Sequence, residues 1–402
     1  MLRAGVGQSS NPITQRAAEE AAAQAMARAG ISQADLVLVF FTVDHLPEHQ
    51  KLIETLRRVA RTDRILGCSG VGVLTGEGGE IEGGAGLAVL VLSSDDVEAH
   101  PFLFHPLRER DLEMGVEIGQ VAGIRPQKRS LLVLMPDAYN GHPRRLLQGI
   151  EEHLGYVPVV GAGSSENGTQ GKTYQLCGDT MTTNALSGLL LTGPFTSSIG
   201  ITQGCQPVSG PMVITKAEGN LIYEIDNRPA FDTFARAIKG PLLEDLRRAL
   251  AFVFAGLPAD RRQNRVGPGE YLVRNIVGVE PQKGILALAE EVFEGERMVF
   301  TLRDAQRARE DLTQMLHRQK ERLGGKRPQL GLYFNCCARG TSLYGIPGID
   351  TAYIRKTLGD FPLIGFFGNF ELGPLGKKNH LLAYTGVLVL ISEAGESPKG
   401  LQ

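Results

Sequence analysis

Arg339 and Glu371 occupy positions in this 402-residue chain where charged side chains could bind a ligand. Each follows an apolar run directly, so both are expected at the carboxyl ends of strands, where open α/β sheets usually bind their ligands. The Arg339 guanidinium could hold a carboxylate through two parallel hydrogen bonds, and Glu371 could take an ammonium group. The pair therefore predicts a site for a zwitterion. The alternative is an internal ion pair between Arg339 and Glu371.

Small and polar residues in the same kind of strand-end turn complete the predicted ligand site. They are Cys68, Ser69, Gly70, Asn140, Ser164, Cys336, Gly340 and Asn369. Cys336 and Cys337 are adjacent, and neighbours in a strand face opposite sides. We therefore expect one of these two cysteines to line the site while the other packs in the core.

Catalytic and metal sites find little support in the sequence. Gly67-Cys68-Ser69-Gly70 is similar to a nucleophile elbow, but Val71 stands where that motif needs a second glycine. No paired histidine is visible for Cys68, so we interpret it as a small packed residue. His45 and His49 lie four residues apart without further clustered ligands, which argues against zinc. We expect no catalytic residue, no metal and no cofactor.

The elements that must position these residues recur three times. Residues 35–93, 130–193 and 329–392 each read as a strand, a helix, a strand that reaches a glycine and a last apolar strand. The glycines are Gly67, Gly161 and Gly365, and a glycine at one fixed place implies a bend or a close backbone approach. Repetition at this spacing predicts one supersecondary block used three times.

A further strand and helix precede each repeat. In the third block, residues 297–302 read as this strand and residues 304–323 as a long helix. A short helix should then begin at Asp350 as its N-cap and end at Gly359.

The fold class predicted is α/β, with two domains built from repeated βαβ-type blocks and internal pseudo-symmetry. Residues 1–200 form the first domain, with blocks at 2–93 and 97–193. Residues 201–402 form the second, with an insert-like segment at 201–296 and the third block at 297–392. Gly, Pro and Ser cluster near 193–210, which places the boundary there.

Composition excludes several classes of partner. The formal net charge is −2, so neither nucleic acid nor an anionic membrane surface is an expected partner. The five cysteines are an odd number without a CxxC pair, which is typical of a reducing compartment. No apolar run approaches the roughly 18 residues of a membrane helix. We expect a cytoplasmic protein.

Three motifs resemble the FIST family, whose members combine a FIST N-terminal and a FIST C-terminal domain. They are YLVRNIVGV, Cys337-Ala338-Arg339-Gly340, and PLIGFFGNFELGPLG followed by YTGVLVLI. The N-terminal domain would cover about residues 35–205 and the C-terminal domain about 218–392. Phe370 departs from the family pattern, which commonly has glycine before the acidic residue. The resemblance implies a non-catalytic sensory protein that binds a small ligand such as an amino acid.

Because the repeats occupy nearly the whole chain, we expect signalling through a separate protein partner. A protein-interaction adaptor is the alternative function, and a cysteine-dependent enzyme centred on Cys68 or Cys336 is a third. A sensor should have an enclosed pocket of roughly 300–1,000 Å³ with a few converging polar groups. An adaptor should expose a large apolar patch. An enzyme should place a base within about 3.2 Å of a thiol.

Overall fold

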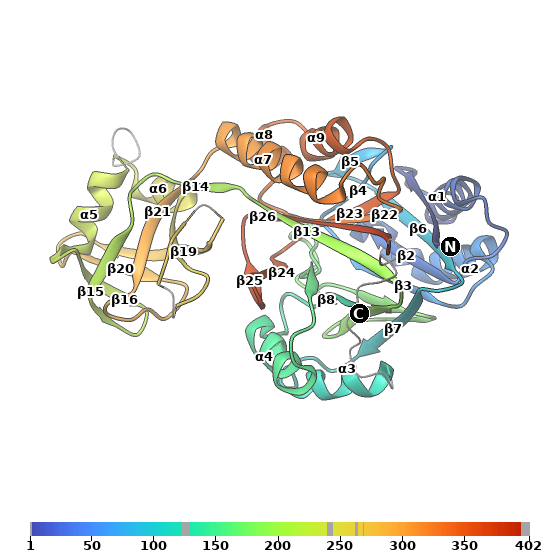
Figure 1. Ribbon diagram of the computed structural model, residues 1–402, viewed down its shortest axis with the longest axis horizontal. Helices are drawn as coiled ribbons and strands as arrows, with labels where there is room; N and C mark the ends of the chain where they lie inside the picture. Colours follow the sequence, from blue (N-terminus) through green and yellow to red (C-terminus); the bar gives the residue numbers. More distant parts are fainter. Residues whose placement is uncertain (1, 123–128, 239–243, 262–263, 268, 395–402) are drawn as a thin grey trace, which may run out of the picture. The chain divides into compact units, whose positions relative to one another are not determined.

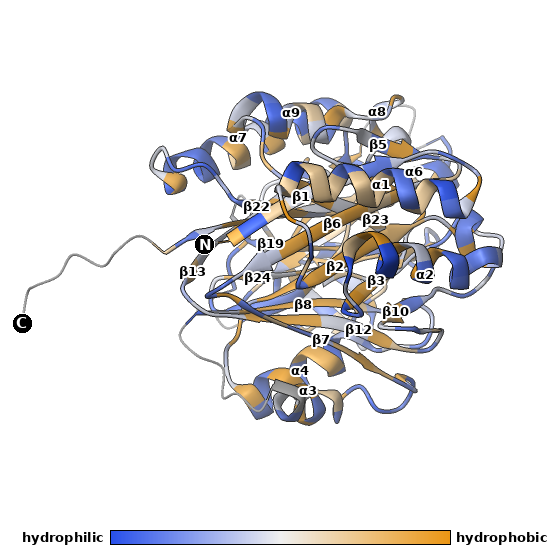
Figure 2. Ribbon diagram, turned by 90° about the vertical axis from the view of Figure 1, so that its right-hand side faces the viewer, coloured by the Kyte–Doolittle hydropathy of each residue, from blue (hydrophilic) through white to orange (hydrophobic). Residues whose placement is uncertain are grey.

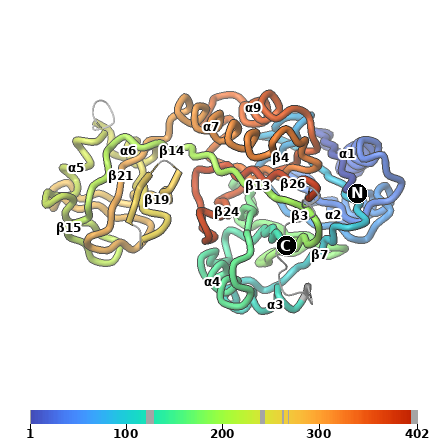
Figure 3. Tube along the Cα trace, viewed as in Figure 1, coloured from blue at the N-terminus to red at the C-terminus, as the bar shows by residue number. Residues whose placement is uncertain are grey.

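The structure is a computed structural model that describes residues 2–122, 129–238, 244–261, 264–267 and 269–394 (Figure 1). These residues form two compact units. The first takes in residues 2–201, 313–381 and 385–394, and the second takes in the described residues of 202–312 and 382–384. The chain thus leaves the first unit after residue 201 and returns to it within a long helix, a path that can be followed in Figure 3.

Three blocks with the same order of elements build the first unit. The first block comprises β1 (Leu2–Ser9), α1 (Thr14–Ala29), β2 (Leu36–Phe41), the 3-10 helix η1 (Val43–Glu48), α2 (His49–Ala60), β3 (Ile65–Ser69), β4 (Gly72–Thr75), β5 (Gly79–Glu82) and β6 (Leu87–Ser94). The second comprises β7 (Glu98–Phe104), α3 (Met114–Ala122), β8 (Ser130–Pro136), α4 (Pro143–Leu154), β9 (Val159–Ala162), β10 (Gln175–Cys177), β11 (Thr180–Thr182) and β12 (Leu186–Thr192). The third comprises β13 (Phe195–Gln203), α7 (Ala305–Leu323), β22 (Leu330–Cys336), α8 (Thr341–Tyr344), α9 (Ile349–Leu358), β23 (Leu363–Gly368), β24 (Glu371–Leu375), β25 (Lys378–Leu382) and β26 (Thr385–Glu393).

Each block contains one hairpin of short strands, and these are β4–β5, β10–β11 and β24–β25. Each hairpin joins the sheet of another block. The first sheet has the order β1-β6-β2-β3-β10-β11 and so ends in the hairpin of the second block. The second, β25-β24-β9-β8-β12-β7, takes the hairpin of the third block. The third, β13-β26-β22-β23-β4-β5, takes the hairpin of the first. This cyclic exchange ties the three blocks together by backbone hydrogen bonds, and the predicted α/β fold with repeated blocks and pseudo-symmetry is confirmed.

The third block begins earlier than its predicted start at residue 297. Its first strand is β13, which pairs with β26, whereas β21 (Arg297–Arg303) lies in the sheet of the second unit. Only β21 stands directly before the long helix α7 in the sequence, as the first strand of a block should, and the second unit separates β13 from that helix. The spacing therefore placed the start of the block at the wrong strand. The compact units also follow a different division from the domains predicted at 1–200 and 201–402, because strand pairing joins the third block to the first two.

In the first unit, the helices and strands carry apolar residues on the faces by which they pack against each other. Ala17, Ala21 and Ala25 of α1 are fully buried, and they share a core with Val37 and Val39 of β2. Figure 2 shows the same division, with apolar residues along the strands and polar residues on the outer faces of α1, α2 and α9. Burial of these apolar faces is the main favourable contribution to the stability of the layers.

The glycine repeated in the three blocks marks one structural position. Gly67, Gly161 and Gly365 lie in β3, β9 and β23, each opposite a residue of the neighbouring parallel strand. A Cβ atom at these glycines would stand 1.8, 1.9 and 1.8 Å from the carbonyl oxygens of Val39, Leu134 and Tyr333, respectively. The predicted close backbone approach is therefore confirmed in all three blocks.

The described residues of the second unit form a small β-barrel, which is accompanied by the helices α5 (Ala230–Ala237) and α6 (Leu246–Phe252). The strands of this unit are β14 (Cys205–Pro207), β15 (Met212–Glu218), β16 (Leu221–Ile225), β17 (Arg228–Pro229), β18 (Val253–Pro258), β19 (Tyr271–Glu280), β20 (Ile285–Leu288) and β21. The sheet runs β21-β15-β16-β20-β19-β18 and closes because β18 also pairs with β21. Phe234 and Phe300 meet edge to face in its core, with ring centroids 5.5 Å apart.

None of the helices in the described part of the chain has a stretch long and apolar enough to cross a membrane.

Candidate functional site

Arg339 follows β22 and is fully buried. Its Nε donates to Oδ2 of Asp350 at 3.0 Å and its Nη2 donates to Oδ1 at 3.1 Å. The two-pronged contact predicted for Arg339 is thus made with a carboxylate of the chain itself. The internal ion pair predicted as the alternative is present, with Asp350 in place of Glu371, because α9 brings Asp350 against the end of β22.

Asp350 is the acceptor at the centre of this buried pair. The hydroxyls of Tyr333 and Tyr344 also donate to it, at 2.9 and 2.8 Å. Burial alone would raise the pKa of Asp350, but the Arg339 guanidinium and the donated hydrogen bonds hold it below its usual value. Asp350 is not the N-cap predicted for this helix: α9 begins after Gly348, while Gly359 ends it as predicted.

Glu371 lies apart from Arg339, at the start of β24. Its Oε2 accepts hydrogen bonds from the backbone N–H of Thr385 at 3.1 Å and from the Thr385 hydroxyl at 2.7 Å. Burial, and after it the neighbouring Cys336, raises the pKa of Glu371 well above its usual range. Asp350 takes the two-pronged contact of Arg339 and Thr385 holds Glu371, so the hydrogen bonds of these two charged residues do not join them in one site.

The small polar residues at the strand ends do come together from all three blocks. The Ser69 hydroxyl donates to the carbonyl of Ser165 at 3.0 Å, and the Ser165 hydroxyl donates to the carbonyl of Phe367. The N–H of Asn369 donates to the carbonyl of Gly163 at 2.9 Å. These residues form an interlocked strand-end cluster in which Ser69 and Ser164 are fully buried. The hydrogen bonds named here link the blocks to one another.

Cys68 is fully buried, and burial raises the pKa of its thiol far above the ordinary value. Cys336, the last residue of β22, is also buried, while Cys337 lies in the turn after the strand and is exposed. A thiol that resists ionisation is a poor nucleophile, which favours a packing role for Cys68.

Asn140 and Gly340 complete the predicted set, and both have structural contacts. The Asn140 amide donates to Oδ2 of Asp137 at 3.2 Å. Gly340 has a φ of 55°, and a Cβ there would stand 2.6 Å from the Glu82 carboxylate oxygens.

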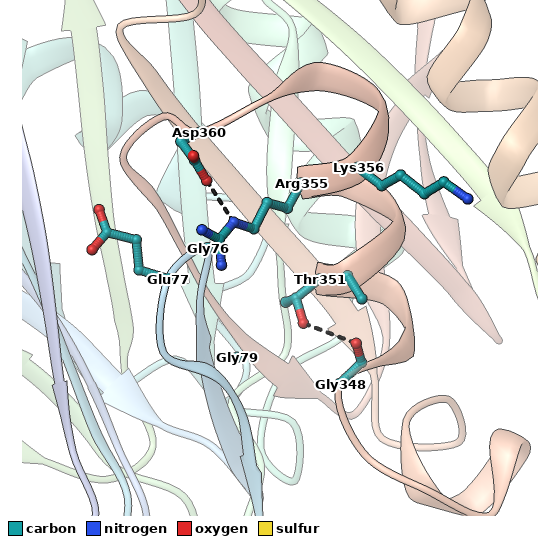
Figure 4. A pocket seen from close by; sticks show the side chains of 9 residues that line it. Gly76, Glu77, Gly79, Gly348, Thr351, Arg355, Lys356 and Asp360 are labelled. Carbon is teal, nitrogen blue, oxygen red and sulfur yellow. Dashed lines mark hydrogen bonds and ion pairs between the residues drawn. The ribbon is translucent and has the colours of Figure 1, made fainter.

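A hollow of about 520 Å³ lies on a different part of the first unit, between the β4–β5 turn and α9. Its lining comes from two blocks and comprises Gly76, Glu77, Gly79, Gly348, Thr351, Ala352, Arg355, Lys356 and Asp360. In Figure 4 the Arg355 side chain extends from α9 toward the turn, while Lys356 points away from it. The hollow exists because the hairpin of the first block joins the sheet of the third.

Both walls of this pocket carry a charged side chain that is held by a neighbour. Arg355 Nε donates to Oδ1 of Asp360 at 2.5 Å, and its terminal nitrogens donate to none of the described residues. Across the pocket, Glu77 pairs with Nη2 of Arg28 at 2.7 Å. The Glu77 side chain extends from the turn away from Arg355 (Figure 4). The Arg355 guanidinium is therefore the charged group of this lining that is best placed to hold a ligand carboxylate in a two-pronged contact.

Sequence reasoning missed Arg355 and Glu77. Arg355 lies in the last turn of a helix, where basic residues commonly interact with the helix dipole and the solvent. The glycines around Glu77 were the available signal, since Gly76, Gly78 and Gly79 mark a turn with an open backbone.

Two solved structures of cyanuric acid hydrolase align with the chain at low similarity. One, from A. caulinodans, covers 48% of this chain and 71% of that protein, with 12% identity and a TM-score of 0.28. The other covers 98% of this chain and 100% of that protein, with 12% identity and a TM-score of 0.34.

Similarity in sequence extends over almost the full chain. An uncharacterized protein of Mycobacterium tuberculosis strain H37Rv is 28% identical over 389 residues, which cover 97% of this chain and 99% of that protein. An uncharacterized protein of Mycobacterium bovis is 28% identical over 390 residues, which cover 97% and 98%. The FIST N domain matches residues 35–228 and the FIST C domain matches residues 230–374. The chain therefore belongs to the FIST family.

Proposed function

We propose that this protein is a non-catalytic, cytoplasmic sensor that binds an amino acid or a similar small carboxylate and signals through a separate partner. Family membership supports a small-ligand sensory role, since this is the role of FIST domains. The observation that carries the proposal is the pocket between the β4–β5 turn and α9, with Arg355 on one wall and Glu77 on the other. None of the five cysteines, all of which lie in the described part of the chain, forms a disulfide, and this supports a reducing compartment.

Arg355 is the proposed carboxylate ligand of this pocket. Asp360 fixes its Nε, so both terminal nitrogens remain available for a two-pronged contact. Glu77 is the acidic side chain of the same lining after the β4 strand and is the proposed partner of the ligand ammonium, and the hydroxyl of Thr351 also lines the pocket. The volume of about 520 Å³ is in the range of ordinary small-molecule sites.

Thermal unfolding in the presence of each of the twenty amino acids tests this proposal. A ligand at 100 times its Kd stabilises the native state by about 2.7 kcal/mol through mass action. For a unit of this size, the expected rise in Tm is roughly 5–11 °C, at about 2–4 °C per kcal/mol. Acetate and ethylamine, which carry only one of the two charges, should give much smaller shifts. If no amino acid raises the Tm, the proposed ligand class is wrong.

Arg355→Ala should weaken binding of the amino acid that gives the largest shift by roughly 10–150-fold, because charged hydrogen bonds contribute about 1.5–3 kcal/mol. Arg57→Ala is the matched control. Arg57 lies in the last turn of α2, and its Nε pairs with Oδ1 of Asp63 at 2.5 Å, outside the pocket lining. Calorimetric titration should find wild-type affinity in Arg57→Ala. Equal affinity in both variants would remove Arg355 from the site.

Cys68→Ser and Cys336→Ser should both keep ligand binding, with Kd within about tenfold of wild type, which corresponds to 1.4 kcal/mol. Both cysteines are buried away from the pocket lining, so each substitution acts on packing rather than on the ligand. The same calorimetric titration measures this. Complete loss of binding in a folded variant would favour a cysteine-centred site.

A further inference from the structure

The hairpin β4–β5 of the first block carries two carboxylates that hold helices of the third block. Glu80 and Glu82 lie two residues apart in β5, so their side chains point to the same face of the strand. Both residues are half-buried. Glu80 reaches the start of α9, and Glu82 reaches the start of α8. A strand of one block thus supplies hydrogen-bond acceptors to two helices of another.

Glu80 accepts three hydrogen bonds at the start of α9. Its Oε2 accepts from the N–H of Gly348 at 2.8 Å, and its Oε1 accepts from the N–H and the hydroxyl of Thr351 at 3.1 and 3.2 Å. The first N–H groups of a helix need acceptors from outside the helix, and the N-cap Gly348 has no side chain that could supply one. Acceptance from three donors by both carboxylate oxygens is the arrangement that an ionised carboxylate makes.

The donors that Glu80 holds form part of the proposed ligand pocket. Gly348 and Thr351 both line it, and Figure 4 shows them on the same side as Arg355, which belongs to the same helix as Thr351. Glu80 is not among the described residues that line the pocket, so it acts on a ligand there through Gly348 and Thr351.

Glu82 makes the same kind of contact away from the pocket. Its Oε1 accepts from the N–H and the hydroxyl of Thr341, both at 3.0 Å, and its Oε2 lies 3.2 Å from the same N–H. Neither Glu82 nor Thr341 is among the described residues of the pocket lining. The first and third blocks are therefore joined by two similar carboxylate contacts, and the donors of Glu80 alone belong to the described pocket wall.

We infer that Glu80 is a positioning residue of the pocket: from the first block it fixes the start of α9 in the third, and with it the wall formed by Gly348 and Thr351. Its effect on ligand binding rests on the function proposed above, whereas the contact itself does not. Because the wall and its support come from different blocks, the affinity of the pocket depends on how the hairpin β4–β5 docks on the third block.

Glu80→Gln and Glu82→Gln test this role as a matched pair. Glutamine keeps the shape of the side chain, but its amide nitrogen donates and cannot accept from a backbone N–H, so each substitution removes an acceptor. Burial, and after it Asp350, raises the pKa of Glu80 to about 7. The measurements are therefore made at pH 8, where the carboxylate is mostly ionised.

Hydrogen exchange of the ligand-free variants is the first measurement. Glu80→Gln should lower the protection of the Gly348 and Thr351 amides by about tenfold, the equivalent of one charge-assisted hydrogen bond. The Thr341 amide should keep its wild-type protection in this variant. Glu82→Gln should have the reverse effects on the same amides. Unchanged protection of Gly348 and Thr351 in Glu80→Gln would overturn the positioning role.

Calorimetric titration with the amino acid that gives the largest thermal shift then measures the effect on binding. The Kd should rise by about tenfold in Glu80→Gln and keep its wild-type value in Glu82→Gln, although both variants lose an acceptor between the same two blocks. A purely structural role would change the two Kd values alike, and that result would also overturn the positioning role. If no amino acid binds the wild-type protein, the role of Glu80 in binding falls with the proposed function, while the exchange result still decides its contact with α9.

Discussion

Replacing Asp350 with alanine is expected to lower the free energy of unfolding of the first unit by about 3–5 kcal/mol. The substitution leaves the fully buried Arg339 guanidinium without its carboxylate, and an uncompensated buried charge is costly. It also removes the acceptor of the Tyr333 and Tyr344 hydroxyls. Urea unfolding followed by far-UV circular dichroism measures the change.

Asp360→Ala is the matched control for this prediction. It also removes an aspartate from an arginine pair at α9, but the side chains of Arg355 and Asp360 are 54% and 57% exposed. Exposed pairs contribute about 0–1 kcal/mol, so the unfolding midpoint should change little. Equal losses in the two variants would show that burial of the Arg339–Asp350 pair has no special energetic importance.

Gly365→Ala should destabilise the first unit by about 1–3 kcal/mol. The added methyl group would stand 1.8 Å from the carbonyl oxygen of Tyr333, so strands β22 and β23 must move apart where they pair. Alanine ordinarily stabilises a protein at an unstrained glycine by restricting the unfolded chain. The expected loss therefore has the opposite sign from the usual effect, and chemical denaturation reports it.

Gly84→Ala is the comparison that isolates the close approach. A Cβ at Gly84 would meet no heavy atom within 4 Å, and the residue does not have a positive φ. This variant should be neutral or slightly more stable than wild type. Our interpretation of the repeated glycine fails if Gly365→Ala behaves in the same way as Gly84→Ala.

The repeat itself was determined by the sequence. Gly67, Gly161 and Gly365 could be aligned because the approach of two parallel backbones excludes a Cβ wherever it occurs, and this exclusion is a local requirement. The motifs that identified the family also lie within continuous stretches.

Only the tertiary structure decided which partners these residues meet. Hairpin β4–β5 joins β23 and not the sheet of its own block, a pairing between residues nearly 300 positions apart that local spacing does not encode. That exchange brings Glu77 and Arg355 into the lining of one pocket and places Glu80 against α9. Arg339 shows the same limit: the sequence placed a guanidinium at a strand end, but the packing of α9 supplied Asp350 as its acceptor. A local pattern sets the type of element and the face of a residue, whereas non-local packing sets its neighbours and therefore its chemistry.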